Sequence, residues 1–257
     1  MRLFPAWAAW RGVREMSESI LPLVAENLRY QVNGWSLIED ISLTVGEGTF
    51  TVVLGPNGAG KSLLLRLLHG LIEPSSGKVG WNGEVASGDG MLRRRQAMVF
   101  QRPVLLRRSV EANVRYALKW QGVPRPERRA AIDAALDRAG LAGLRRVPAR
   151  LLSVGEQQRL VVARALAGDP DILFLDEPTA SLDPASVQQI EALLVEANAR
   201  GTAVVLVTHD IGQARRLGRE IMFVHRGQVI ESGPADLFFG QPRTAAAGAY
   251  LEGKIIV

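Results

Sequence analysis

The sequence predicts an α/β fold in which helices cover the faces of a mostly parallel β-sheet. Short apolar runs of strand length alternate with segments in which apolar residues repeat at helical spacing. Glycine and proline separate these segments, and strands that alternate with helices are typical of a parallel sheet. The 257 residues are enough to bury a core. The absence of cysteine excludes disulfides, thiolate metal sites and a cysteine nucleophile.

The first part of the chain is predicted to supply strands around one glycine-rich segment. Apolar residues alternate over 37–45, which predicts a half-buried strand. Phe50–Leu54 is a nearly continuous apolar run, as expected of a buried parallel strand. A helix over 62–69 follows the glycine-rich residues, and short strands are expected at 78–81 and 97–100.

The pattern then becomes helical, which predicts an inserted helical subdomain over about 102–158. Val110, Val114 and Leu118 repeat at helical spacing, and two prolines end that run. A second helix is expected over 130–139. Gly140 is suited to stop this helix, because glycine tolerates the left-handed conformation common after a helix end.

Strands and helices alternate again after this insertion. Asp183 and Pro184 are typical of a helix start, as N-cap and first-turn residue. Arg226-Gly227 is typical of a hairpin turn between two strands. The expected order is helix 156–167, strand 172–175, helix Pro184–Ala199, strand 203–208, helix Ile211–Leu217, and the hairpin strands Glu220–His225 and 228–232.

A phosphate-binding loop lies between the predicted strand Phe50–Leu54 and the helix that follows it. Glycines let the backbone wrap around a phosphate, so that amide groups and the helix N-terminus face the anion. Lys61 is suited to reach the β- and γ-phosphates, and the Ser62 hydroxyl to ligate Mg²⁺. The sequence therefore predicts a phosphate loop that binds a nucleotide with Mg²⁺. The predicted nucleotide-binding residues are Gly55, Pro56, Asn57, Gly58, Ala59, Gly60, Lys61, Ser62 and Leu63.

Two adjacent carboxylates end the apolar run 172–175. Burial of carboxylates is costly without a counter-ion, and Mg²⁺ supplies one. Asp176 is therefore predicted to hold Mg²⁺, and Glu177 to orient or deprotonate the attacking water.

Residues 152–159, Leu-Ser-Val-Gly-Glu-Gln-Gln-Arg, resemble the signature segment of ABC-type ATPases. The resemblance covers roughly residues 22–240 and implies an ABC-type nucleotide-binding domain with a small antiparallel β region and a helical insertion. It also implies that the fold is that of a P-loop NTPase and that the nucleotide is ATP. Val154 departs from the family pattern, which usually has glycine there. The further motifs, in family order, are the phosphate loop, Gln101, the Asp176-Glu177 pair, Ser181-Leu182-Asp183 and His209.

The resemblance implies roles within one copy of the chain for three of these residues. Tyr30 would stack on adenine, although local packing in a strand is the alternative. Gln101 would sense Mg²⁺ and the attacking water, and its loop would meet a transmembrane partner. His209 would contact the γ-phosphate, so that Glu177, His209, Gln101 and Lys61 form the catalytic set, and Ser62, Gln101 and Asp176 the metal set.

Other residues act between two copies of the chain in the family that the sequence resembles. Ser153 and Gly155, with Glu156 where glutamine is common, would close over the γ-phosphate of ATP held by the second copy. Asp183 would communicate across that dimer. The resemblance therefore implies a homodimer with two ATP molecules at its interface.

The segment 98–110, together with the signature, is similar to ATPase subunits of tungstate importers; those of phosphate and polar amino-acid importers are near relatives. The partners so implied are transmembrane permease subunits, with Leu105 and Leu106 in a groove of the permease, and indirectly an extracytoplasmic substrate-binding protein. Molybdate is a further alternative substrate. A soluble ABC ATPase acting on nucleic acid is less favoured, so no nucleic-acid partner is expected. A P-loop kinase is disfavoured because it has no use for a signature segment.

The chain is basic, and its two ends are predicted to differ from the rest of the domain. The formal net charge is +5, mostly from arginine, and genome composition, anionic lipid or nucleic acid are the alternative explanations. No apolar run reaches the roughly 20 residues that span a bilayer. The resemblance to importer ATPases implies a peripheral place on the cytoplasmic face of the cell (inner) membrane. Residues 1–15 are predicted to be an extension outside the folded ATPase domain of 16–257, and 241–257 a short tail.

Overall fold

The computed structural model describes residues 19–85 and 90–254, and its centre is a six-stranded sheet. The strand order is β10-β9-β3-β8-β7-β6, and all neighbours are parallel except the β9–β10 hairpin. This mixed, mostly parallel sheet confirms the predicted fold class. Its strands are β3 (Phe50–Leu54), β6 (Gln96–Val99), β7 (Ile172–Asp176), β8 (Ala203–Val207), β9 (Glu220–His225) and β10 (Gln228–Pro234).

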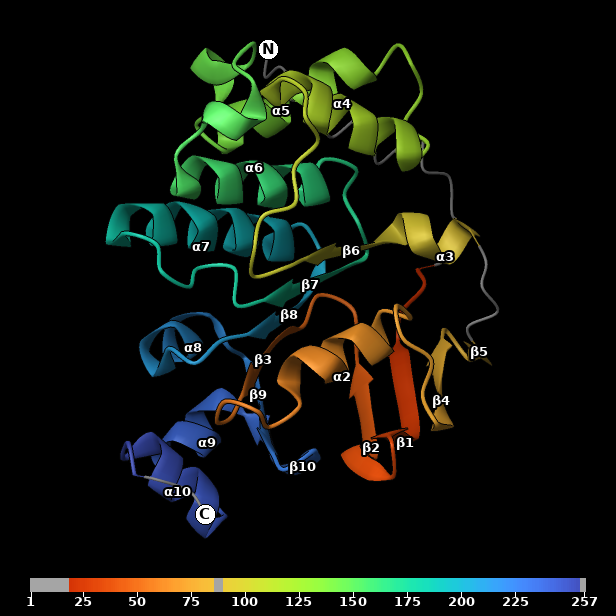
Figure 1. Cartoon of the computed structure of the whole chain (residues 1–257), viewed down its shortest axis with the longest axis vertical. Helices are drawn as coiled ribbons and strands as arrows, with labels where there is room; N and C mark the ends of the chain where they lie inside the picture. The colour runs from red at the N-terminus through yellow and green to blue at the C-terminus, as the bar shows by residue number, and fades with distance from the viewer. Residues whose placement is uncertain (1–18, 86–89, 255–257) are drawn as a thin grey trace, which may run out of the picture.

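A second, antiparallel sheet with the order β2-β1-β4-β5 lies beside the first (Figure 1). Its strand β2 pairs along most of β1, and Tyr30 of β1 lies opposite Ile38 of β2. The half-buried strand is confirmed, but its burial departs from the predicted alternation: Leu37 is exposed and Ile38 is buried instead, because register shifts between β1 and β2 interrupt the period of two. The strands are β1 (Leu23–Val32), β2 (Trp35–Val45), β4 (Ser76–Trp81) and β5 (Glu84–Val85).

Helices cover the central sheet, and α4, α5 and α6 gather at one end of the molecule beyond α7 (Figure 1). The helices α4 and α5 fall in the stretch that the sequence predicted to be helical. The α-helices are α2 (Lys61–Leu68), α3 (Gly90–Arg95), α4 (Val110–Trp120), α5 (Arg128–Arg138), α6 (Val154–Leu166), α7 (Pro184–Ala199), α8 (Ile211–Leu217), α9 (Ala235–Gly240) and α10 (Ala245–Leu251). Two 3₁₀ turns, η1 (Ala142–Leu144) and η2 (Ala149–Leu151), join α5 to α6.

Central strands β3, β7 and β8 are buried over their whole length. Because side chains alternate across a sheet, each strand contributes to an apolar cluster on either face. Leu173 and Leu175 of β7 join the cluster with α6 and α7, whereas Ile172 and Phe174 join the cluster with α2. Because both faces of the sheet are covered, every residue of these strands is buried, and their sequences are nearly continuous apolar runs.

The C-terminal segment contains a helix that packs against the core. Residues 241–257, predicted as a short tail, contain α10, in which Ala247 is buried. The Tyr250 ring of α10 lies 5.1 Å from that of Phe223 in β9. Residues 1–15 lie outside the described residues. No helix in the described ranges is long and apolar enough to cross a bilayer.

Candidate functional site

The loop from Gly55 to Gly60 connects β3 to α2, as the phosphate-loop pattern predicts. Gly55 has a φ of +147°, and a Cβ atom there would lie 2.0 Å from the carbonyl oxygen of Val224. Gly60 has a φ of +99° and caps α2 without a side-chain hydrogen bond. Only glycine fits these two positions, and the first amides of α2 stay available to an anion.

Lys61 is the first residue of α2, and only 6% of its surface is exposed. Its Nζ donates hydrogen bonds to the carbonyl oxygens of Gly55 (2.7 Å) and Pro56 (2.9 Å), so the side chain folds back over the loop. Burial lowers the pKa of Lys61, while the charges of Glu177 and Asp176 raise it. The ammonium group is thus held inside the loop, where a phosphate would meet it.

Ser62 and Asp176 come from distant parts of the sequence and meet at this loop. The Ser62 Oγ donates a hydrogen bond of 2.7 Å to Asp176 Oδ1. Burial raises the pKa of Asp176, although the Ser62 hydrogen bond and nearby cations oppose this shift. Mg²⁺ in nucleotide sites is usually held by one or two protein oxygens plus phosphate and water. The hydroxyl and the desolvated carboxylate fit such an ion, because its charge would offset the cost of burial.

Glu177 and His209 form the next contact, at the ends of β7 and β8. His209 Nδ1 lies 3.2 Å from Glu177 Oε2. The Glu177 backbone has a φ of +46°, which is unfavourable for a residue with a side chain, and its N–H donates to the Val207 carbonyl oxygen at 3.0 Å. Backbone strain of this kind persists where the surroundings fix it, commonly at functional sites.

A buried polar network holds the segment that follows Glu177. Gln213 of α8 is fully buried and its Nε2 donates to Thr179 Oγ1 and Glu191 Oε1, both at 3.1 Å. Arg216 also donates to Glu191 Oε1, at 2.7 Å. The network ties α7 and α8 to the loop after Glu177 and so restrains the backbone that follows this residue.

The signature residues and Asp183 form a separate cluster. Ser153 and Glu156 cap α6 reciprocally, since Ser153 Oγ accepts from Glu156 N–H and Glu156 Oε2 accepts from Ser153 N–H. Asp183 caps α7 by accepting from Ser186 N–H at 2.9 Å. A Cβ atom at Gly155 would lie 2.3 Å from Ser186 Oγ, so the two helix starts are in close contact. Figure 1 shows the start of α6 well apart from the loop before α2.

Tyr30 and Gln101 are the remaining predicted residues. Tyr30 lies opposite Ile38, and the Ile38 Cδ1 would lie 3.0 Å from a Cβ at Gly60, so this strand pair borders the phosphate loop. Gln101 follows β6 and is exposed. In the loop after it, Leu105 packs against the core and Leu106 is partly buried, whereas Val104 is 64% exposed.

Two residues that contact the loop were not found from the sequence. Gly227, in the β9–β10 turn, donates from its N–H to the Ala59 carbonyl oxygen at 3.0 Å. Burial raises the pKa of Tyr250, and the backbone amide of Gly55 opposes this shift, so the Tyr250 hydroxyl lies near the start of the loop. The turn signal at Arg226-Gly227 was visible, but its contact with the loop was not; Tyr250 carries no sequence signal.

The arrangement brings an ammonium group, a hydroxyl, two carboxylates and an imidazole to the carboxyl ends of β3, β7 and β8. Parallel α/β sheets bind ligands at this edge. Such a set can bind a polyphosphate with a divalent cation and position water against it. Ser153 and Asp183 form a separate cluster at the starts of α6 and α7, so this chain alone does not place them in the set.

Comparison with known proteins agrees with this geometry. Residues 38–180 match the ABC transporter family. The chain is 38% identical to the phosphate import ATP-binding protein PstB 2 of Natronomonas pharaonis, over 91% of this chain and 87% of that protein. It is 39% identical to the tungstate uptake system ATP-binding protein TupC of Peptoclostridium acidaminophilum, over 85% of this chain and all of that protein (100%).

A solved structure is similar as well. It is a dimeric, post-hydrolysis state of an ATP-binding cassette bound to ADP and Pi, which matches with a TM-score of 0.74 and 30% identity. The match covers 82% of this chain and 98% of the other.

Proposed function

The chain belongs to the ABC transporter family, and from this premise we propose that it is the ATP-hydrolysing subunit of an importer for an oxyanion, tungstate in the first place. One observation carries the ATPase assignment: Lys61, Ser62, Asp176, Glu177 and His209 meet at one edge of the sheet although they span almost 150 residues of sequence. Each has the chemistry that the resemblance assigns to it.

In this proposal, Lys61, Ser62 and Asp176 bind ATP and its Mg²⁺, and Glu177 and His209 act in hydrolysis. Lys61 Nζ exchanges the carbonyl oxygens of Gly55 and Pro56 for β- and γ-phosphate oxygens. Mg²⁺, when bound by Ser62 and Asp176, neutralises charge on the phosphates. Glu177 orients or deprotonates the attacking water, and His209, 3.2 Å from Glu177, contacts the γ-phosphate.

A second copy of the chain completes the site. Exposed Ser153 and partly exposed Glu156 lie at the start of α6, where a partner's phosphate loop can face them, while Gly155 is buried against Ser186 and Asp183 lies beside it. The related cassette bound to ADP and Pi is dimeric, which supports this assembly. ATP then favours the closed dimer, and hydrolysis reverses that preference.

The loop after Gln101 is the proposed contact with the transmembrane permease. Buried Asn113 fixes it, since Asn113 Oδ1 accepts from Leu106 N–H at 2.9 Å and Nδ2 donates to the Leu106 carbonyl oxygen at 3.2 Å. Val104 is the exposed apolar side chain of this loop. The proposal accordingly expects the chain to lie peripherally on the cytoplasmic face of the membrane, and an external binding protein to deliver the substrate to the permease.

Uptake in cells tests the substrate. Cells that lack the gene receive either the wild-type chain or Glu177→Gln, and uptake of labelled tungstate, molybdate and phosphate is measured. The proposal expects the wild type, and not the variant, to restore tungstate uptake. Restoration of phosphate uptake alone would assign the second candidate, a phosphate importer, which the similarity to PstB 2 favours.

A further inference from the structure

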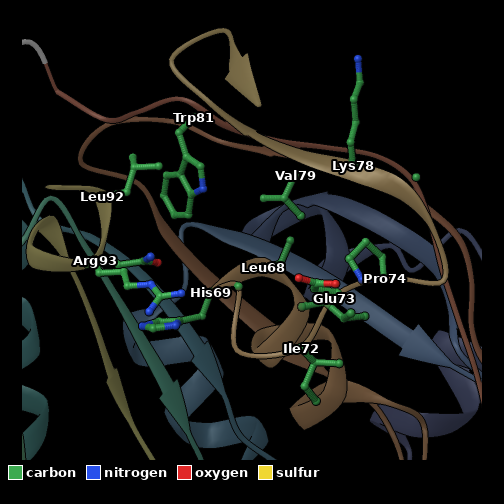
Figure 2. Close-up of a pocket in the computed structure, with 14 residues that line it drawn as sticks. Leu68, His69, Ile72, Glu73, Pro74, Lys78, Val79, Trp81, Leu92 and Arg93 are labelled. Atoms are coloured by element: carbon green, nitrogen blue, oxygen red, sulfur yellow. The ribbon is translucent and has the colours of Figure 1, made fainter. Parts of the chain in front are cut away.

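A cavity of about 360 Å³ lies at the end of α2 opposite the phosphate loop (Figure 2). Small-molecule sites are concave, mostly apolar and typically about 300–1,000 Å³ in volume. The walls fit this description. Apolar side chains of Leu68, Ile72, Val79, Trp81 and Leu92 line the cavity, and the flat indole of Trp81 stands over one side of it.

Two buried polar atoms of the lining have no partner. Gln96 is 8% exposed, and its Oε1 accepts no hydrogen bond from any described residue. The buried Nδ1 of His69 is likewise without a partner among the described residues. Burial lowers the pKa of His69 to about 4, and the nearby Arg93 charge adds to this effect, so the imidazole is neutral at pH 7. Unpaired buried polar groups are costly, and in native structures they are usually satisfied by ordered water or by a bound group.

Charges at the cavity are distributed unevenly. Arg93 lies beside His69, whereas Glu73 lies on the other side of Leu68 (Figure 2). Lys78 points away from the cavity and pairs with Glu26 at 3.0 Å. The side of the cavity near His69 and Arg93 therefore combines one cation with one unpaired polar atom, and Gln96 adds a second unpaired atom to the lining.

We propose that this cavity is a second ligand site, which binds a small planar aromatic compound bearing one anionic group and one N–H or O–H donor. Trp81 stacks on the ring, Arg93 pairs with the anion, and Gln96 Oε1 accepts from the donor. The site is distinct from the phosphate loop, because none of the residues from Gly55 to Ser62 lines it.

Three structural elements connect the cavity to the nucleotide site. Helix α2 runs from Lys61 to the residue before His69, and β6 runs from Gln96 toward Gln101. The His69 ring also contacts Phe174 of β7 at 5.7 Å, two residues before Asp176. Through these elements we expect a ligand in the cavity to alter nucleotide affinity, and by linkage nucleotide to alter the affinity of the cavity ligand equally. This coupling, unlike the binding, rests on the proposed function.

Binding of 1-anilinonaphthalene-8-sulfonate to the full chain tests the site, because this fluorescent probe has an aromatic ring system, an N–H and a sulfonate. The probe should bind saturably and be sensitised by tryptophan excitation. Trp81→Phe should remove most of the sensitised emission. Arg93→Gln should weaken binding at least fivefold, whereas Glu73→Gln should strengthen it because a repelling charge is lost.

Arg94→Gln is the matched control, since exposed Arg94 shares α3 with Arg93 but does not line the cavity. Its affinity should equal that of the wild type. Leu92→Trp, which fills the cavity, should abolish binding. The proposal is overturned if Arg93→Gln binds as tightly as Arg94→Gln, or if Trp81→Phe leaves the sensitised emission unchanged.

The coupling has its own readout. Probe affinity is measured without nucleotide and with saturating Mg²⁺ and a non-hydrolysable ATP analogue, and a change of at least twofold is expected. An unchanged affinity, with the analogue shown to be bound, contradicts the coupling. Failure of the analogue to bind contradicts the proposed ATPase function. The cavity is then tested by probe binding without nucleotide, which does not depend on that function.

Discussion

Helix α2 begins at the phosphate loop and ends beside the cavity. Buried polar atoms are hydrogen-bonded at the first end but lack partners among the described residues at the second. At the first end, Lys61 Nζ donates to two carbonyl oxygens and Ser62 Oγ donates to Asp176. At the other end, His69 Nδ1 and Gln96 Oε1 have no partner among the described residues. The phosphate-loop end is therefore organised before any ligand arrives, whereas the cavity end keeps unpaired polar atoms.

The two ends also differ in how they are encoded. The phosphate loop lies within eight consecutive residues and has a pattern that a sequence reveals. The cavity brings together α2, β4, α3 and β6, so its geometry exists only in the folded chain. A sequence motif thus identifies the phosphate loop, whereas the cavity is identified only by its buried, unpaired polar atoms in the folded structure.

Glu177→Gln gives the largest expected effect, at the phosphate-loop end. Removal of the carboxylate that activates water should lower the rate of ATP hydrolysis at least about a hundredfold, the usual range for a general base. ATP binding should persist because Lys61 and the loop are intact. Steady-state phosphate release measures the rate, with exposed Glu47→Gln as the control. Hydrolysis at the wild-type rate would remove Glu177 from its role.

Lys61→Ala is expected to weaken ATP binding by roughly a hundredfold, because the buried ammonium is the cation closest to the loop carbonyls. Titration with a fluorescent ATP analogue measures this affinity. Lys119→Ala, at an exposed position on α4, should bind as the wild type does. Equal affinities for the two variants would contradict the assignment of the loop.

His69 makes the cavity end sensitive to acid. The pKa of His69 is about 4 in the folded chain against an ordinary value of 6.5, so the unfolded chain takes up this proton first as the pH falls. Stability is therefore lost between pH 6.5 and 4, by up to about 3 kcal/mol. Urea unfolding at both pH values should show a smaller loss for His69→Gln. An equal loss in the two proteins would mean that His69 titrates normally.

Gln96→Leu should have the smallest effect and the opposite sign. Because Gln96 Oε1 is buried without a partner among the described residues, an apolar side chain of similar size should raise the free energy of unfolding by about 1 kcal/mol. Thermal unfolding measures the change. A clear destabilisation would show that the amide has a structural partner and would weaken the contrast between the two ends of α2.

Much of the fold follows from local sequence. The bounds of Phe50–Leu54 and Pro184–Ala199 agree with the predictions, since burial on both faces gives a continuous apolar run and Asp183 with Pro184 marks a helix start. Helices α3, α9 and α10 were not expected. They span six or seven residues, and a helical period is hard to recognise over so short a stretch, although α8, which also has seven residues, was predicted with its observed bounds.

The site was predictable to a similar extent. Adjacency of Ser62 and Asp176 follows from parallel strands that end at one edge. The roles of Ser153, Gly155 and Asp183 stay predictions, because they depend on a second chain. Contacts such as Gly227 with Ala59 and Tyr250 with Gly55 join residues more than 150 positions apart. No local pattern encodes them, so only the folded structure reveals them.

The central claim is that ATP joins two copies of this chain, with the phosphate loop of one facing Ser153 of the other. Light scattering of purified Glu177→Gln, with and without Mg²⁺ and ATP, tests it most directly. The account predicts the monomer mass without nucleotide and twice that mass with ATP, and a return to monomer when Ser153→Arg is added. A mass that stays monomeric while ATP is bound would contradict the account.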